Sequence, residues 1–186
     1  MNINLELNLF LDKELIYKKV SDPLVKAFHY FIYSVLTNDT SLNLLDVTGT
    51  NRASPWAFSG YELRINSERN DDSYGPVVGT GTDAVTINDY ALKTKITHGT
   101  GAGQMEHGKT EIIPISVSGY EAFFNYTRPF TNKSGSSITV NEVGLYVNYR
   151  SQTWTYLFAR DVISGGVSVL DGKIFTVNYK MSVSVA

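Results

Sequence analysis

The clearest pattern of hydrophobic and polar positions lies at the C-terminal end of the chain. Five apolar residues alternate there with polar ones: Val177, Tyr179, Met181, Val183 and Val185. A period of two places the apolar side chains on one face of a β-strand and the polar ones on the other. Such a strand needs a sheet to pair with and a core to cover, and the rest of the chain has to supply both.

The same period occurs at the N-terminus. Ile3, Leu5, Leu7 and Leu9 alternate with polar residues, which predicts a second strand. Two arrangements are open for it: it pairs within its own domain, or it extends as an arm onto a neighbouring subunit. Residues 12–19 are charged and mixed in character, and we expect them to form a connection.

One segment has the period of an amphipathic helix. Ser21, Asp22 and Pro23 form a start signal, because Ser caps free N–H groups, Asp complements the positive helix end and Pro needs no donor in the first turn. Apolar residues at spacings of three and four then predict a helix over about residues 22–37: Leu24, Phe28, Phe31, Ile32, Val35 and Leu36. We expect it to pack on the sheet; the alternative is that it also lines a subunit interface.

The middle of the chain has weak strand signals separated by loops. Short strands are predicted over 42–47, 61–65 and 84–87, a pattern-free stretch over 48–55, and polar or Gly-rich loops over 69–75 and 98–108.

The strand signals strengthen in the last third of the chain. Further strands are predicted around 112–117, 120–130, 138–149, 154–162 and 167–170. Pro114 indicates an edge strand or a strand end. The apolar phase changes at Asn141 and Glu142, which predicts a bulge or bend. We expect residues 164–166 to form a loop and Asp171-Gly172 to form a two-residue hairpin turn.

The predicted elements give eight to ten short strands, one helix and no alternation of strand and helix. The fold class that we expect is mainly β, an antiparallel β-sandwich or jelly-roll-like fold with one amphipathic α-helix near the N-terminus. Residues 1–50 would hold the N-terminal strand or arm and the helix, packed on the domain or extending from it. Residues 51–186 would form the β-sandwich domain, and the whole would be one structural unit.

Composition and charge narrow the function classes. A chain of 186 residues can bury a core without covalent staples, and the absence of cysteine rules out disulfides and fits folding in a reducing cytoplasm. The net charge of −2 and the lack of a Lys/Arg run give no nucleic-acid footprint. No apolar run has the length of a membrane span, and the first ten residues do not read as a signal peptide, so we expect no membrane partner.

One stretch matches the P-loop pattern G-x-x-x-x-G-K-[ST], through Gly103, Gly108, Lys109 and Thr110. A P-loop needs a buried strand before it and a helix after it, so that backbone N–H groups cradle the phosphates. Here a Gly-rich segment precedes the match, and β-branched residues with Pro114 follow it. We interpret the match as chance and expect no cofactor.

Two groups of residues have the chemistry of metal ligands, and we expect no metal at either. His98, Glu106 and His107 lie in a Gly-rich loop without helical spacing to preset their geometry. The second group is a set of polar-turn carboxylates that does not follow the EF-hand pattern: Asp71, Asp72 and Asp83.

Signals of catalysis are weak. The chain has no Cys nucleophile and no G-x-S-x-G elbow, and His29 lies within the predicted helix. Glu142 and Asp161 could approach each other across neighbouring strands, as paired acids do in glycoside hydrolysis. The interpretation that we favour is structural, with Glu142 and Arg160 pairing across the sheet and no catalytic residue.

Several stretches in the last two thirds of the chain carry a resemblance to a known family. They are Val78-Gly79-Thr80-Gly81-Thr82, Asp89-Tyr90-Ala91-Leu92, the run from Ile138 to Tyr146, Phe158-Ala159-Arg160-Asp161-Val162 and the Asp171-Gly172 turn. In this order they resemble virion structural proteins of tailed bacteriophages and prophages, of the tail-fibre, tail-collar or other virion-associated kind. The resemblance covers roughly residues 74–186. No catalytic residues belong to this pattern, so none are implied.

The resemblance implies a non-enzymatic structural component of the virion, located in the tail, collar, baseplate or capsid surface and made in the host cytoplasm. Its expected partners are other virion proteins and further copies of itself, in a trimer or a higher ring. The residues that we expect at assembly contacts are Ile3, Leu5, Leu7, Leu9, Phe28 and Phe31. An alternative function is a carbohydrate- or receptor-binding module that contacts a host surface glycan, with Trp56, Trp154 and tyrosines stacking on sugars. An NTPase or hydrolase is a third alternative.

Overall fold

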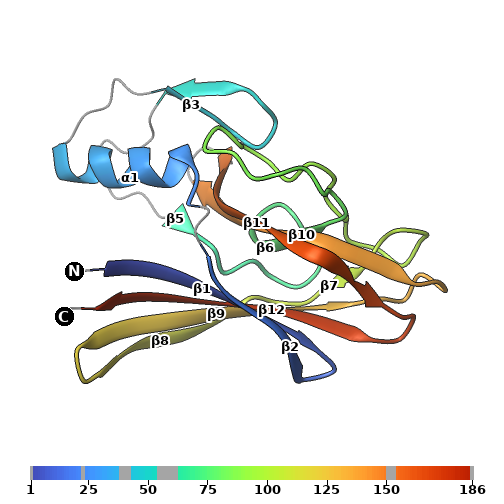
Figure 1. The fold of residues 1–186 in the computed structure, drawn as a ribbon. Helices are drawn as coiled ribbons and strands as arrows, with labels where there is room; N and C mark the ends of the chain where they lie inside the picture. Colours follow the sequence, from blue (N-terminus) through green and yellow to red (C-terminus); the bar gives the residue numbers. More distant parts are fainter. Residues whose placement is uncertain (1, 22–23, 38–42, 54–62, 150–153, 185–186) are drawn as a thin grey trace.

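The computed structural model shows a mainly β protein with antiparallel sheets and one short helix (Figure 1), which confirms the coarse fold class. It describes all residues except 1, 22–23, 38–42, 54–62, 150–153 and 185–186.

The described residues form the following elements: β1 (Asn2–Leu11), β2 (Glu14–Ser21), α1 (Lys26–Thr37), β3 (Asn43–Leu45), β4 (Asn51–Ala53), β5 (Leu63–Arg64), β6 (Gly75–Gly79), β7 (Glu106–His107), β8 (Glu111–Ser118), β9 (Glu121–Thr131), β10 (Ile138–Tyr149), β11 (Trp154–Val169) and β12 (Ile174–Ser184).

The larger sheet, called sheet A here, has the strand order β2-β1-β12-β9-β7, and β8 also pairs with β9. The C-terminal strand β12 lies at its centre, between β1 and β9, and its residues Val177 and Tyr179 are fully buried. The N-terminal strand β1 pairs with β12 of the same chain from Asn2 to Leu11. Both strands predicted from alternation are therefore present, and of the two arrangements left open for β1 the monomer adopts pairing within its own chain.

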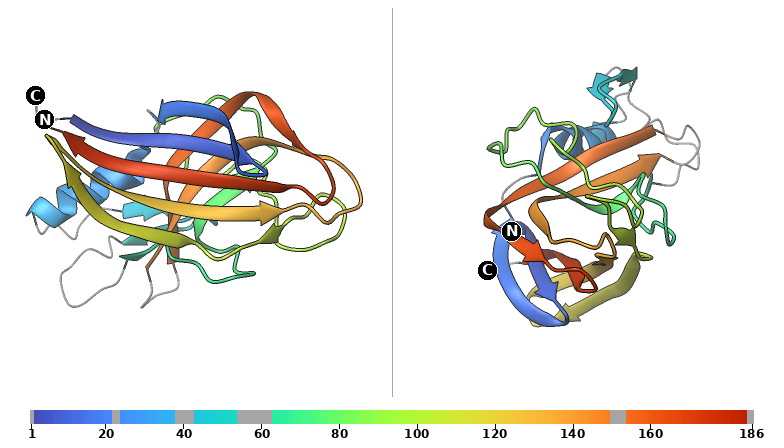
Figure 2. Two further views of the ribbon diagram at one scale, coloured as in Figure 1. Left: turned by 90° about the horizontal axis from the view of Figure 1, so that it is seen from below. Right: turned by 90° about the vertical axis from the view of Figure 1, so that its right-hand side faces the viewer.

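The second sheet, called sheet B here, has the order β11-β10-β5 with β6 also paired to β10, and β3 and β4 form a separate small hairpin. One hydrophobic core joins the two large sheets: Leu7 and Tyr126 reach it from sheet A, and Val143 and Leu145 reach it from sheet B. Figure 2 shows sheet A as a curved layer with β10 and β11 on its inner side. No helix in the described part of the chain is long and apolar enough to cross a membrane.

The helix begins four residues later than the sequence predicted. Ser21 ends β2, so it does not cap a helix, and Asp22 and Pro23 lie outside the described residues. Leu24 forms a β-bridge with Ala159, and the Val25 N–H donates to the Phe158 carbonyl at 3.0 Å. Pairing with β11 therefore holds this segment extended until Lys26. The expected packing on a sheet is present, because α1 rests on β11 through ring contacts between Phe28, Phe31 and Phe158.

Four local predictions were wrong. Residues 14–21 form strand β2, because Asp12 and Lys13 adopt positive φ and make a tight turn directly after β1. Residues 51–53, expected to have no regular structure, form β4 beside β3. Residues 84–87, expected to be a strand, lie in a loop. Residues 164–166, expected to be a loop, are part of β11.

Two local features lie where the sequence predicted a bulge and a turn. The register of β10 against β11 shifts between Val140 and Glu142, where the change of apolar phase predicted a bulge. Asp171 and Gly172 form a tight turn before β12, with Gly172 at a φ of 79° that favours glycine, but the predicted hairpin is absent because β11 and β12 belong to different sheets.

Candidate functional site

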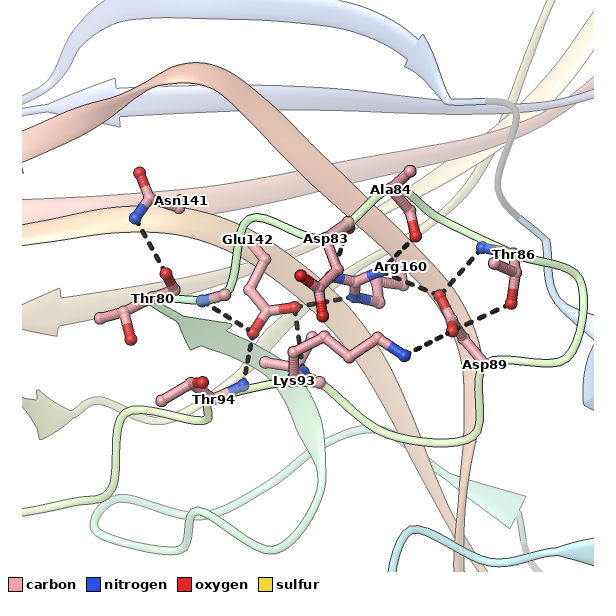
Figure 3. A network of polar contacts seen from close by, with 12 residues as sticks. Thr80, Asp83, Ala84, Thr86, Asp89, Lys93, Thr94, Asn141, Glu142 and Arg160 are labelled. Atoms are coloured by element: carbon pink, nitrogen blue, oxygen red, sulfur yellow. Dashed lines mark hydrogen bonds and ion pairs between the residues drawn. The ribbon is translucent and has the colours of Figure 1, made fainter.

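The most strongly charged buried cluster lies on sheet B, around Arg160. The Arg160 Nε donates to Glu142 Oε2 at 2.7 Å, and its Nη1 donates to Asp89 Oδ2 at 2.9 Å (Figure 3). The exposed fractions of these side chains are 0% for Arg160, 0% for Glu142 and 2% for Asp89. We call Arg160, Glu142, Asp89 and the loop segments bound to them the Arg160 centre. The two residues that the sequence predicted to pair are thus in direct contact.

The strand register explains why Glu142 and Arg160 meet. Arg160 lies directly opposite Gly144, and Glu142 lies opposite Val162. Glu142 and Arg160 are therefore diagonal neighbours on the same face of the sheet, a distance that long side chains bridge. Gly144 leaves space above the pair: a Cβ at this position would lie 2.9 Å from Leu92 Cδ2.

Backbone N–H groups of a long loop complete the shell of Glu142. Its Oε1 accepts from Thr94 at 2.8 Å and from Gly81 at 3.1 Å, and its Oε2 accepts from Lys93 at 3.2 Å. A Cβ at Gly81 would lie 2.5 Å from Oε1, closer than real Cβ contacts allow. Glycine is therefore required here because the loop backbone has to approach the carboxylate closely.

Asp89 is bound as fully as Glu142. Its carboxylate accepts from the Thr86 N–H at 3.0 Å, from the Thr86 hydroxyl at 3.1 Å and from Lys93 Nζ at 3.0 Å, in addition to Arg160. Burial alone raises the pKa of Asp89, but these hydrogen bonds outweigh it and hold the pKa below its ordinary value. Arg160 Nη2 also donates to the Asp83 carbonyl at 2.9 Å. The centre therefore fixes the loop 80–94 onto sheet B.

The stretches that carry the family resemblance meet at this centre. Gly81, Asp89, Glu142 and Arg160 each come from a different one of them. Tyr146 belongs to the same assembly, because its hydroxyl accepts from the Leu92 N–H at 3.0 Å, and burial raises its pKa to about 12. Sequence reasoning missed Asp89 as a member of the site, although the stretch that contains it was itself a signal.

A second buried arginine lies under sheet A. Arg128, on β9, donates to the carbonyls of Gly108 at 2.9 Å, Tyr74 at 3.0 Å and Pro76 at 3.0 Å, and also to the carbonyl of Asp71. Burial lowers the pKa of Arg128 to about 10, so it stays charged at neutral pH. We call Arg128, these carbonyl-bearing segments and His107 the Arg128 centre. No sequence pattern around Arg128 indicated this role.

His107 is the histidine of the Arg128 centre and is almost fully buried. Its ring packs edge-on against Phe130, with the centroids 4.9 Å apart, and neither ring nitrogen has a hydrogen-bond partner among the described residues. Burial, followed by the charge of Arg128, lowers the pKa of His107 to about 3. The imidazole is therefore neutral at physiological pH. The sequence placed His107 in a Gly-rich loop, whereas in the structure it lies on β7, where it pairs with Phe130 of β9 and is buried.

The P-loop match has a different geometry from a phosphate cradle. Lys109 Nζ pairs with Glu68 at 3.1 Å, and the buried Thr110 hydroxyl is hydrogen-bonded to Ser67 at 2.7 Å. Strand β8, and no helix, follows the match. Gly103 and Gly108 lie in the loop around β7, where a Cβ at Gly108 would meet Pro129 at 2.6 Å.

The candidate metal ligands are used in other contacts. Asp72 accepts from the His98 N–H at 2.8 Å and from Lys95 at 3.2 Å, and His98 Nδ1 accepts from the His107 N–H at 3.1 Å. Glu106 pairs with Lys133 at 2.8 Å. Within the described residues, no group of three or more His, Cys, Asp or Glu side chains is placed to hold a metal ion.

Two further residues named from the sequence, Asp161 and His29, lie apart from these two centres. Asp161, on the face of β11 opposite to Arg160, is buried between the sheets and reaches Lys19 at 3.3 Å. The two carboxylates weighed as a catalytic pair, Glu142 and Asp161, thus point to opposite faces of sheet B. His29 is exposed, and its Nδ1 lies 3.3 Å from the Val25 carbonyl oxygen of its own helix.

The residues expected at assembly contacts are mostly inside this chain. Leu5, Leu7 and Leu9 are in the core, Phe28 is nearly buried, and Phe31 is half-buried against Phe158. Ile3 pairs through its backbone with Val183, and its side chain lies outside the description. In the monomer the β1 leucines are therefore core residues and not a free surface, because β1 is an interior strand of sheet A.

A cavity of about 300 Å³ lies between α1, the β3–β4 hairpin and the loop that carries Asp89. Its polar lining includes Lys26, Asn43, Asn51, Asn88 and Tyr90. The Tyr90 ring is held against the hairpin turn, since a Cβ at Gly49 would meet it at 3.4 Å.

Trp154 is not part of this cavity lining. Trp154 is half-buried, with its ring beneath the Arg52 guanidinium at 5.0 Å, and Trp56 lies outside the described residues.

No family model matches this chain, and searches of curated proteins and of solved structures also find no match.

Proposed function

We propose that the protein is a structural component of a tailed-phage virion that acts by symmetric assembly and not by catalysis. In this proposal sheets A and B form a β-sandwich of the jelly-roll kind that serves as a scaffold. The family resemblance of the stretches around Gly81, Asp89, Glu142 and Arg160 supports the proposal.

The observation that carries it is how the charges of the Arg160 centre are used. Both oxygens of Glu142 and both oxygens of Asp89 accept hydrogen bonds from groups of the protein itself. A catalytic carboxylate needs an oxygen within reach of substrate. Here the carboxylates bind backbone N–H groups and Arg160, which is the chemistry of a loop anchor. The residues that carry the resemblance therefore build the scaffold.

The experiment tests whether the protein is present in virions and whether complete particles require it. A phage or prophage that encodes the chain is grown with its gene intact and with an early stop codon, and purified virions are analysed by mass spectrometry and electron microscopy. We expect the intact gene to give particles that contain the protein at a fixed copy number, and the stop codon to give incomplete particles. Complete, infectious particles without the protein would overturn the proposal.

The cavity beside Asp89 favours a second function, binding of a saccharide unit. Side-chain amides such as those of Asn43, Asn51 and Asn88 donate and accept, which suits sugar hydroxyls, and Tyr90 offers an aromatic ring. A volume of about 300 Å³ is at the lower end of the range for small-ligand sites.

A glycan array with the wild-type chain and the Tyr90→Ala variant tests this second function. We expect a bound glycan to lose at least ten-fold in affinity with Tyr90→Ala and to be unaffected by Tyr120→Ala, a substitution of an exposed tyrosine outside the cavity lining. Absence of any bound glycan, or equal losses in both variants, would refute it.

A further inference from the structure

The two edges of sheet A differ in how they are protected. Strand β2, at one edge, carries Lys18 and Lys19, which pair with Glu6 at 3.0 Å and with Asp161 at 3.3 Å. Lysines at an edge disfavour pairing with another chain, because a second strand would have to bury their charge. Strand β8, beside β9 at the other edge, has one charged residue, Glu111, at its end.

Strand β8 is also unusually exposed for an apolar strand. All eight of its residues are exposed, and the exposed fractions reach 70% for Ile115 and 76% for Val117. Its one partner among the described strands is β9, so its outer edge is unpaired in the part of the chain that the structure describes. An apolar edge strand whose one charged residue lies at its end is a template for strand addition.

The bulge in β8 determines which face its apolar side chains occupy. Ile112 lies opposite Tyr126, and Val117 lies opposite Ala122, with a register shift between Ile113 and Ser116. Tyr126 and Ala122 are four residues apart on β9 and share a face. Ile112 and Val117 therefore also share a face, although an odd spacing in a regular strand would separate them. This is the face of Tyr126, which belongs to the core of the molecule.

This arrangement makes β8 complementary to itself. In an antiparallel pair of two β8 strands centred between Pro114 and Ile115, each Ile112 lies opposite the Val117 of the other copy, and each Glu111 lies opposite a Ser118. A two-fold axis through that centre places the core-side faces of the two copies on the same side of the joined sheet. The bulge allows this because it puts Ile112 and Val117 on one face. No like charges meet. The N–H that Pro114 lacks falls at the centre, so the ladder forms from residues 111–113 and 116–118.

We infer that β8 is the contact surface for a second copy of this chain, which pairs with it antiparallel across a two-fold axis and joins the two A sheets. The inference rests on the proposed assembly function and specifies its partner and symmetry: a closed, isologous contact in place of the expected trimer or ring. Both chain termini lie at the same end of sheet A as the β8–β9 turn (Figures 1 and 2). Strand β8 pairs with β9 only from Glu121 to Thr127, so the contact leaves the opposite end of the sheet accessible.

The first test measures the mass of the full-length chain in solution between 1 and 100 µM, in protein concentrations chosen to span about two decades around typical micromolar affinities. We expect a dimer for the wild type and at least a ten-fold weaker dimer for Val117→Lys. The matched control is Leu15→Lys on the other edge, at a residue that is 54% exposed, and we expect it to leave the dimer unchanged. A monomeric wild type, or a Val117→Lys variant that dimerises normally, would overturn the inference.

The second test uses introduced cysteines, which are the only thiols present because the natural chain has none. An Ile112→Cys chain mixed with a Val117→Cys chain should form a disulfide-linked heterodimer on mild oxidation, because paired strand positions place the Cβ atoms within bonding range. Ile112→Cys alone should cross-link at least ten-fold less. Equal cross-linking in the mixed sample and in Ile112→Cys alone would refute the pairing of Ile112 with Val117. If these tests fail while the protein is still found in virions, the pairing is wrong and the proposed function stands.

Discussion

The two buried arginines differ in the groups that balance their charge. Arg160 is neutralised by two carboxylates, Glu142 and Asp89, whereas Arg128 donates to four main-chain carbonyls. Each anchors loop segments onto a strand. The difference lies in what remains if the arginine is removed: two buried negative charges in one case and uncharged carbonyl groups in the other. We therefore expect the ion-paired anchor to be the more vulnerable of the two, because an uncompensated buried charge costs more than an unpaired dipole.

The largest effect is expected from Arg160→Met. This substitution leaves Glu142 buried without its cation and Asp89 with Lys93 as its one remaining cation, and we expect the free energy of unfolding to fall by roughly 3–5 kcal/mol. Chemical denaturation followed by tryptophan fluorescence measures it. The double variant Arg160→Met/Glu142→Gln removes one of the two charges and should lose less than the sum of the single variants. Strictly additive losses would show that the ion pair has no such role.

A smaller loss is expected from Arg128→Met. Methionine fills part of the space and leaves carbonyls without a donor, which should cost about 2–3 kcal/mol. The same denaturation assay applies, with hydrogen exchange of residues 71–76 as a local readout. A loss equal to or larger than that of Arg160→Met would break the comparison between the two centres.

Lowering the pH from 7 to 5 should affect the Arg128 centre and spare the Arg160 centre. The folded pKa of His107, about 3, is below its unfolded value near 6.5, so the unfolded chain takes up the proton first and stability falls as the pH drops below 6.5. The expected loss at pH 5 is about 2 kcal/mol. The pKa of Asp89 is lowered, so its contribution persists to more acidic pH.

The pH dependence is measured by denaturation of the wild type and of His107→Leu at pH 7 and pH 5. The variant should lack the part of the pH effect that His107 supplies. An identical pH dependence in both proteins would contradict the assignment of the effect to His107.

The smallest effect is expected from Gly81→Ala, which tests how tightly the loop is bound to Glu142. The added Cβ would lie 2.5 Å from Glu142 Oε1, so the loop or the carboxylate has to shift, at a cost of roughly 1–2 kcal/mol. The matched control is Gly101→Ala, where the nearest atoms belong to the end of the Gln104 side chain. Equal stabilities of the two alanine variants would mean that the close approach of the loop to Glu142 is not required.

Predictions from the sequence succeeded where a local pattern alone decides the structure. The alternation in β1 and β12, the Asp171-Gly172 turn and the edge position of Pro114 are of this kind. The pairing of Glu142 with Arg160 belongs here too, since neighbouring strands brought the two residues together. The start of α1 was misplaced because a helix-capping signal at Ser21 competed with strand pairing, and the tertiary contact with β11 prevailed.

The class of the fold follows from the sequence, since period-two alternation, turn residues and the lack of strand–helix repeats leave mainly antiparallel sheets. The tertiary structure alone decided what the buried charges do. Asp89 comes to Arg160 across 71 residues, and three of the four carbonyl partners of Arg128 lie 52 to 57 residues earlier in the chain. No local pattern encodes such distances, because a buried charge chooses its partners from whatever groups the packed sheets bring within hydrogen-bond range.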